Sequence, residues 1–464
     1  MKSKAWKPGI ALLGQFIGFG LGITSAQAAT VAVIDSGLDT EHPELLEKVW
    51  LNPVDSSSNN VDEDKNGFMD DIHGWNFAEN SADLIDRAYS SIFNDEIERF
   101  FEIQAKGLKG EATDAEKAWA KERTQDREFI KQLSIYGNYS HGTHVSGIVS
   151  RQGDDVEVIG VKLIPTKNPL QALSDEVSKD VAAGKDVNWI VKRTIKAGLS
   201  LFAKLQAKAL EPVGMYASLE HADVANGSFG FGPQQARMLI GGILKIALRG
   251  SEPNQAQVDE LSAYFLKKVA THQASLVKAA PDTLFVFAAG NDGSNNDIYP
   301  TSPASIDHAN KLSVAATFED GRLAPFSNYG ETSVDLGAVG VSVESTVPDN
   351  RRLAMSGTSQ ASPHVAGTAG AVKAINPALD AQGIKQVILG TVDVTPELKG
   401  KVKSSGVLNT PRALEAARLS KGMKLEDAIR VANKKVSSQL KHSFAPAESD
   451  VSLFVNLQPG LLGN

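Results

Sequence analysis

Three short strings, far apart in the chain, carry the residue types of a serine nucleophile and its activating base. An apolar, β-branched run at 31–34 ends in Asp35, the string HGTHVSG opens on His141, and Ser359 lies in GTSQASPHVAG. A serine hydroxyl is a poor nucleophile until a neighbouring base removes its proton. An imidazole base in turn needs a partner that fixes its tautomer. Together the three side chains could attack an acyl carbon, whereas a lone serine at such a turn is commonly a helix cap.

The three strings and their chain order resemble the subtilisin-type serine peptidases, the subtilase family. The resemblance covers residues 30–410 in segments, with its motifs at both ends. It implies that Asp35 orients the base, that His141 accepts and returns the proton, and that Ser359 attacks the peptide carbonyl. It also implies a helix beginning at the nucleophile. We expect Pro363 in its first turn, where the missing N–H would be unpaired in any case.

Two further segments resemble parts of this family that contact the substrate. An apolar run at 284–289 leads into a glycine turn with Asn291, whose amide is implied as a donor to the oxyanion. An asparagine in such a turn is otherwise a left-handed turn residue. The string NGSFG resembles the edge strand that pairs with the substrate backbone. This implies a substrate-binding set of Asn226, Gly227, Ser228, Phe229 and Gly230.

An acidic loop at 62–71 (DEDKNGFMDD) predicts a calcium site. Oxygen-bearing side chains alternate around a turn glycine, as in the front half of an EF-hand loop. The loop departs from the full pattern, because His73 stands where a bidentate glutamate is expected, and a solvated acidic turn is the alternative. The expected calcium ligands are Asp62, Asp64, Asn66, Asp70 and Asp71.

Other chemistries fit the same motifs less well. His141 and His144 could ligate zinc, but no third ligand lies nearby and zinc leaves the Ser359 string unexplained. We therefore expect His144 to be a packed helical residue. An esterase of unrelated fold would need a Gly-x-Ser-x-Gly elbow, with Asp and His after the serine. A processing or binding module of narrow specificity, built on the same fold, is the second functional hypothesis.

The elements that must position these side chains alternate between strand and helix. Near-continuous apolar runs predict strands at 30–34, 158–164, 222–226, 284–289 and 312–317. Runs of this kind are typical of parallel strands buried on both faces, so the expected fold is a doubly wound α/β domain with helices on both faces. The motifs fall at the carboxyl ends of these strands, where ligands bind in such folds.

Three segments are longer than this fold needs, and we expect them to be helical insertions at 78–137, 166–218 and 232–282. In the first, apolar residues recur at helical spacing from Leu84 to Phe101. Thr113 and Glu116 then form a capping-box pattern that opens a second helix. The pattern predicts a helical hairpin, either as packing decoration or as a border of the cleft that restricts substrates.

Both ends of the chain lie outside the expected catalytic domain, 29–410. Lys2, Lys4 and Lys7 precede an apolar stretch and the small residues AQA, which predicts a signal peptide at 1–28. The chain after it begins almost directly on the first strand, so no pro-segment of the usual kind fits between them. At the other end, 411–464, we expect a helix to 436 and a tail. The tail could be a late strand, a retained tag or disorder.

Composition limits the partners. The formal net charge of −8 argues against nucleic acid and anionic membranes. The chain has no cysteine and so cannot use disulfides. With the signal peptide, this predicts a secreted or periplasmic monomer that acts on polypeptides without stable membrane insertion, stabilised by a large core and calcium.

Overall fold

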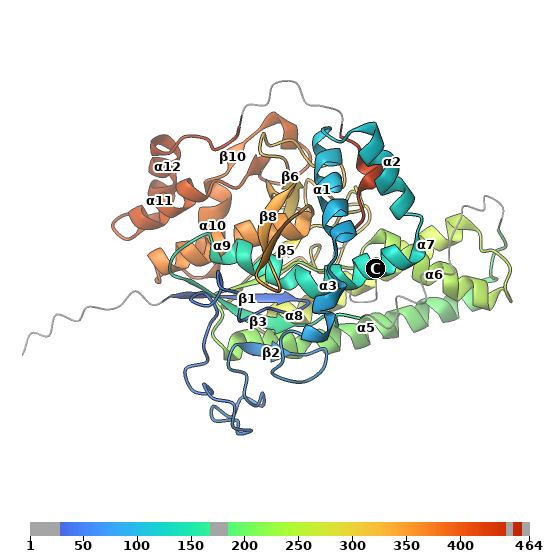
Figure 1. Ribbon diagram of the computed structural model, residues 1–464, viewed down its shortest axis with the longest axis horizontal. Helices are drawn as coiled ribbons and strands as arrows, with labels where there is room; N and C mark the ends of the chain where they lie inside the picture. Colours follow the sequence, from blue (N-terminus) through green and yellow to red (C-terminus); the bar gives the residue numbers. More distant parts are fainter. Residues whose placement is uncertain (1–27, 168–183, 442–448, 457–464) are drawn as a thin grey trace, which may run out of the picture.

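A nine-stranded sheet forms the centre of the molecule in the computed structural model (Figure 1), which describes residues 28–167, 184–441 and 449–456. The strand order is β10-β11-β7-β6-β5-β4-β1-β3-β2, and all neighbours are parallel except β10 and β11. The strands are β1 (Ala29–Asp35), β2 (Gly74–Asn76), β3 (Val156–Lys162), β4 (Val224–Gly227), β5 (Leu284–Ala288), β6 (Lys311–Thr317), β7 (Leu336–Val339), β10 (Asp393–Val394) and β11 (Gly406–Val407). A separate antiparallel pair consists of β8 (Val343–Val347) and β9 (Arg351–Met355).

All five expected strands are present, and the doubly wound α/β class is confirmed. Strand order reverses at β1, which has the later strand β4 on one side and β3 on the other. In open α/β sheets a ligand crevice forms at such a reversal, outside the carboxyl ends of the strands. Asp35 is the last residue of β1. The sequence pattern did not predict β2, β7, the β8–β9 pair or the short strands β10 and β11.

Helices cover both faces of the sheet. Helices α3 (Arg127–Ser150) and α9 (Thr358–Ile375) pack on one face, and their small and β-branched residues share one core with β1, β5 and β6. Helices α5 (Trp189–Leu219) and α8 (Ala274–Lys278) cover the other face, where Tyr216 and Phe285 belong to a second core. Both His141 and Ser359 therefore lie on helices that are fixed by the main core.

The first insertion is a helical hairpin, with one correction to its boundaries. Helix α1 (Asp95–Lys109) ends at Gly110, and α2 (Asp114–Arg123) begins at the expected capping box, in which Thr113 and Glu116 bond reciprocally. The predicted start near residue 84 is wrong. Asn94 caps α1 with two backbone hydrogen bonds, and the preceding apolar residues lie in a loop and a 3-10 turn, η1 (Arg87–Ile92).

The other insertions are helical as far as they are described. The second contains α5, and its residues 168–183 lie outside the described part of the chain. The third contains α6 (Pro233–Ala247), α7 (Gln255–His272) and α8. Helices α5, α6 and α7 form a core of their own around Phe265 and Leu261, at the right of Figure 1.

The C-terminal region packs on α9 and the main core. Helix α10 (Ala381–Gly390) is followed by the 3-10 turn η2 (Pro396–Leu398), α11 (Thr410–Ser420) and α12 (Leu425–Lys435). The expected single helix to residue 436 is thus two helices, broken at the glycine turn between them. Ala416 and Ala432 belong to the main core. In the tail, the described residues 449–456 include a 3-10 turn, η3 (Val451–Leu453), which lies beside α1 and α2 (Figure 1). The tail forms no strand within these residues.

The predicted signal peptide lies outside the described residues, except for Ala28. Among the helices that the structure describes, none combines the length and the apolar character needed to cross a bilayer.

Candidate active site

The first two candidate residues meet in a buried hydrogen bond. The Nδ1 of His141 lies 2.7 Å from Oδ1 of Asp35, and both residues are almost fully buried. They are 106 positions apart in the chain and come from α3 and from the end of β1. Since Nδ1 faces the carboxylate, the Nε2 of His141 is the ring atom that remains for a second partner.

Close backbone contact brings the two elements together. A Cβ on Gly142 would lie 2.0 Å from the carbonyl oxygen of Gly37, so α3 can approach the turn after β1 only with glycine at this position. The Gly142 N–H also donates to Oγ of Ser36 at 3.2 Å. The glycine after His141 is therefore required for the contact with Asp35.

Ser359 stands at the beginning of α9, one residue into the helix. Its hydroxyl donates to the carbonyl of Ser228 at 3.1 Å, and the hydroxyl of Ser228 donates back to the Ser359 carbonyl at 3.0 Å. The helix has Gly357 as its N-cap, with no side-chain bond from that residue, and its N-terminus brings a partial positive charge and the Ser359 N–H to the site.

Pro363 does not lie in the first turn as expected. It is the sixth residue of α9, where its missing N–H leaves the carbonyl four residues earlier without a helical partner. That carbonyl belongs to Ser359 and accepts the hydrogen bond from Ser228. The proline thus frees a backbone oxygen that ties the candidate nucleophile to the turn after β4.

Asn291 presents its amide nitrogen toward the same site. Its Oδ1 accepts hydrogen bonds from the backbone N–H and the hydroxyl of Thr358, at 2.9 and 2.8 Å. These two bonds orient the side chain, so that Nδ2 points away from Thr358. The turn is held by Asn328, whose Oδ1 accepts from the N–H groups of Asp292 and Ser294. The sequence analysis did not identify Asn328 or its role.

His141, Asn291 and Ser359 line one small cavity of about 20 Å³. Its other walls include Phe101 and Gln104 from α1 and Val455 from the tail. All three candidate residues are less than 10% exposed, and Ser359 only 1%. A volume of this size holds about one water molecule, so the site is covered by its own chain.

The predicted substrate strand needs correction at Asn226 and Gly227. Asn226 and Gly227 are inside the sheet, with β1 paired on one side and β5 on the other, so neither has a free edge. The Phe229 side chain is fully buried in the second core. Ser228 and Gly230 follow the end of β4, and the Ser228 carbonyl is occupied by the Ser359 hydroxyl. Only the residues beyond the strand end keep a position suited to an extended peptide.

His144 is packed as expected. It is fully buried, and its Nε2 lies 2.9 Å from the Leu353 carbonyl and 3.1 Å from the Val343 carbonyl. Two carbonyls require a proton on Nε2. Burial, together with a smaller effect of the nearby His141 and Arg151, lowers the pKa of His144 to about 3. The ring is therefore neutral in the folded protein.

This burial predicts a specific loss of stability in acid. The unfolded chain binds a proton at His144 below about pH 6.5, whereas the folded chain does so only near pH 3, so the contribution is complete above pH 6.5 and is lost as the pH falls. Urea unfolding is measured in a Ser359→Ala background with and without His144→Gln. We expect the stability difference between the two to shrink by about 1.4 kcal/mol per pH unit below pH 6.5. Parallel pH curves for the two proteins would contradict this assignment.

Four of the five predicted calcium ligands gather at one point, together with a residue that the sequence analysis missed. The Nδ2 of Asn66 donates to Asp64, Asp71 and Glu220, at 3.2, 3.1 and 2.9 Å. Asp62 accepts from the backbone N–H groups of Asn66 and Gly67. Glu220 is the C-cap residue of α5 and lies 154 positions from Asn66, so no local pattern could reveal it.

Asp70 points elsewhere. Its carboxylate accepts hydrogen bonds from the backbone N–H groups of Asn59 and Asn60, on the outer side of the loop. Within the acid cluster, burial raises the pKa of Glu220 to about 7, and the carboxylate of Asp71 adds to the shift. Burial also raises the pKa of Asp71. The cluster thus holds negative charge that is poorly compensated by the side chains around it.

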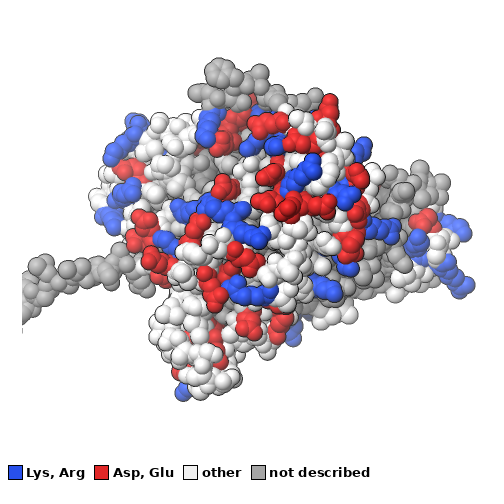
Figure 2. Space-filling view, viewed as in Figure 1, with Lys and Arg blue, Asp and Glu red and all other residues white. Residues whose placement is uncertain are grey.

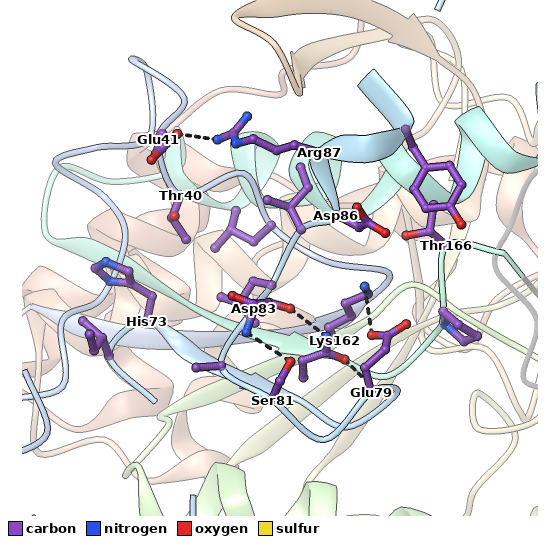
Figure 3. A pocket seen from close by; sticks show the side chains of 18 of the residues that line it. Thr40, Glu41, His73, Glu79, Ser81, Asp83, Asp86, Arg87, Lys162 and Thr166 are labelled. Atoms are coloured by element: carbon purple, nitrogen blue, oxygen red, sulfur yellow. Dashed lines mark hydrogen bonds and ion pairs between the residues drawn. The ribbon is translucent and has the colours of Figure 1, made fainter. Parts of the chain in front are cut away.

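A larger cavity, of about 860 Å³, lies beside these residues and contains none of the candidate catalytic side chains (Figure 3). Polar side chains from the turns after β1 and β2, from η1 and from the end of β3 line it. Lys162 reaches Glu79 at 3.0 Å, and Arg87 reaches Glu41 at 2.6 Å. These ion pairs fix the cavity wall next to β1.

Comparisons with known proteins agree with the fold and the motifs. The family model described as the subtilase family matches residues 26–410. Subtilisin-like protease 1 of Plasmodium vivax is 27% identical over 405 residues, 84% of this chain and 48% of that protein. Alkaline elastase YaB of Bacillus sp. (strain YaB) is 43% identical over 105 residues, 23% of this chain and 26% of that protein. The chain spans about half the length of the Plasmodium relatives it matches.

A cold adapted subtilisin-like serine proteinase of known crystal structure aligns with a TM-score of 0.42 at 18% identity, over 83% of this chain and 88% of that one. The family match covers more than half of the present chain and includes all three candidate strings. The chain belongs to the subtilase family.

Proposed function

We propose that this chain is a serine endopeptidase that hydrolyses peptide bonds through an acyl-enzyme. The observation that carries the proposal is the 2.7 Å contact between His141 and Asp35 beside a cavity that Ser359 and Asn291 also line. These are the base, its orienting carboxylate, the nucleophile and an oxyanion donor in one place. Membership of a family of serine peptidases supports the same reaction.

In the proposed reaction, the Ser359 hydroxyl leaves the Ser228 carbonyl and turns to Nε2 of His141. The imidazole takes the proton as Oγ attacks the peptide carbonyl, and Asp35 stabilises the imidazolium that forms. The negative charge on the carbonyl oxygen is met by Nδ2 of Asn291 and by the Ser359 N–H at the N-terminus of α9. His141 then returns its proton to the leaving amine, and water releases the acyl group by the reverse route.

A fluorophosphonate, which labels activated serines, tests this function. The protein and its Ser359→Ala variant are treated with the reagent and then given casein. We expect labelling of the first, with casein cleavage by it or by a form without residues 449–464, and neither in the Ser359→Ala variant. Absence of labelling in every form of the protein, including forms without the tail, would count against a serine peptidase.

A narrow-specificity processing or binding module is the second candidate function. The observation in its favour is the closed site, in which Phe101, Gln104 and Val455 stand over the nucleophile. Labelling by the small reagent without casein cleavage would support it. Cleavage of casein at many bonds would support the general endopeptidase.

We further propose that the protein is exported to the periplasm or medium and acts as a monomer on polypeptides. Its basic and apolar N-terminal residues support export. Acidic and basic side chains alternate over the described part of one face (Figure 2), as expected for a partner that is neither nucleic acid nor anionic membrane. N-terminal sequencing of protein from the culture medium or periplasm should find a start near residue 29.

Calcium is proposed as a structural ion held by Asp62, Asp64, Asn66, Asp71 and Glu220. The donors are oxygens, which calcium prefers. The pKa values of the buried Asp71 and Glu220 carboxyls are raised, so their negative charge is poorly offset by the surroundings. Among the described residues no set of three or more acidic or histidine side chains has the geometry of a formed metal site, since the Asn66 amide lies between the carboxylates. A bound ion would take the place of that amide nitrogen and supply charge to the loop.

Calcium should therefore raise the melting temperature of the protein. We expect an increase of several degrees between metal-free buffer and millimolar calcium, because an ion that binds only the folded state stabilises it. Asp71→Asn should abolish the increase. Asp70→Asn removes the same charge from a side chain outside the cluster and should retain it. Equal melting temperatures with and without calcium, or equal loss in both variants, would refute the site.

A further inference from the structure

We infer that residues 449–456 are an internal peptide ligand of the catalytic cleft, bound between α1 and the Asn291 turn, and that this contact holds the peptidase closed. The inhibitory part of the inference rests on the proposed function. The family match ends at residue 410, so the resemblance does not account for this segment.

The segment is anchored on the last turns of α1. The N–H of Asp450 donates to the Gly107 carbonyl at 2.9 Å, and a Cβ on Gly107 would lie 3.2 Å from the Leu453 side chain. Leu453 is 2% exposed and is part of the apolar core that α1 forms with α3 and β9. Gln104 donates to the Leu453 carbonyl at 3.4 Å. An inserted leucine and two backbone contacts are typical of a peptide seated in a groove.

Charge supports the same anchor. The hydroxyl and N–H of Ser452 donate to the Asp450 carboxylate and lower its pKa, and Lys117 and Lys121 of α2 lower it further. The acidic residue at the start of the segment thus faces the basic residues of the hairpin. Both helices of the first insertion therefore contribute to binding the segment.

From this anchor the segment crosses to the catalytic residues. The Phe454 ring stacks on Phe326, with ring centres 4.2 Å apart and planes within 5° of each other. Phe326 lies two positions before Asn328, the residue that holds the Asn291 turn. Val455 lines the small cavity together with His141 and Ser359. The Val455 side chain therefore lies at the cavity beside the nucleophile, and the Phe454 ring packs on Phe326 next to the turn that holds Asn291.

The segment ends on the candidate oxyanion donor. The Nδ2 of Asn291 donates to Oδ1 of Asn456 at 3.2 Å. This is the hydrogen bond that the proposed mechanism reserves for the carbonyl oxygen of the substrate. Its present acceptor is a side-chain amide rather than a peptide carbonyl, so the contact occupies the donor without placing a peptide bond on it. The remaining space of about 20 Å³ does not admit a substrate.

A tethered ligand needs little intrinsic affinity to keep such a site filled. Linking a ligand to its site makes binding intramolecular, with effective concentrations that reach the order of 1 mM. A segment of millimolar intrinsic affinity would then occupy the cleft for about half of the time. The ligand class follows from the contacts: a short peptide that forms a 3-10 turn ending at a leucine and continues with an aromatic residue and an amide side chain.

The test compares four chains: the full protein, a chain without 449–464, Phe454→Asp, and Val451→Asp. Val451 is 44% exposed and serves as the matched control, because the same charge enters the same segment away from the cleft. We expect fluorophosphonate to label the truncated chain and Phe454→Asp at least ten times faster than the full protein and Val451→Asp. Phe454→Asp keeps the test decisive if truncation impairs folding.

A binding measurement separates this inference from the proposed activity. A fluorescent peptide of the sequence SDVSLFVN is titrated into the truncated Ser359→Ala chain, with anisotropy as the readout. We expect saturable binding that is weakened at least fivefold by Phe326→Ala, and slower labelling of the active truncated chain as unlabelled peptide is added.

The outcomes discriminate between the two proposals. Equal labelling rates in all four chains, with none in Ser359→Ala, would overturn the inference and leave the peptidase intact. No labelling in any chain would overturn the peptidase. Saturable binding of the peptide would then support the internal ligand, and absence of binding would overturn it.

Discussion

Replacing Ser359 with alanine is expected to lower kcat by about 10⁶-fold, the loss known for the same triad in subtilisin. The variant keeps the 2.7 Å contact between His141 and Asp35 but has no oxygen to attack the substrate. The base then has no proton to take, so the remaining rate comes from substrate positioning and the oxyanion donors alone. The measurement is kcat on a short peptide, with Phe454→Asp as the reference chain so that the covering segment does not limit the signal.

The three residues should behave as one unit. His141→Ala should cost about as much as Ser359→Ala, and the double variant should lose little more, because neither residue acts without the other. Asp35→Asn should cost less, about 10⁴-fold, since Asp35 acts by orienting His141. Losses that multiply in the double variant would mean that the two residues do not share one proton transfer.

Asn291→Ala should lower kcat by about 10² to 10³-fold, or about 3–4 kcal/mol of transition-state stabilisation, with KM nearly unchanged. The amide nitrogen lies in the cavity with Ser359, and Thr358 fixes its orientation through the other end of the amide. A donor held in place before the reaction pays no reorganisation cost when charge develops on the carbonyl oxygen. The effect therefore falls on kcat.

A second variant separates the catalytic role from the structural one. Asn291→Asp keeps an acceptor for Thr358 but replaces the donor with a negative charge. We expect a kcat loss at least as large as in Asn291→Ala, with the melting temperature closer to that of the parent. A rise in KM at constant kcat would instead place Asn291 in ground-state binding.

Local sequence patterns correctly predicted the features that depend only on residues close together in the chain. The buried strands follow from apolar runs, and the capping box at Thr113 from two residues three positions apart. The predicted start of α1 was wrong because the apolar spacing also continues through the preceding loop. The Asn94 cap excludes that loop from the helix. The placement of Asn226 and Gly227 at a sheet edge was wrong because strand order depends on pairing with β1 and β5, which a single strand does not encode.

From the sequence alone came the family resemblance and the candidate set Asp35, His141, Ser359 and Asn291, because these rest on short strings with strict residue requirements. The α/β class followed from the apolar strand patterns. Which residues cover this candidate set could be seen only in the folded chain. The contact of Asn456 with Asn291 spans 165 positions, and that of Glu220 with Asn66 spans 154. Neither residue stands in a distinctive string, since one amide or carboxylate suffices once the fold has brought it there. Contacts of this kind depend on packing between distant segments, so the closed state of the site emerged only from the folded chain.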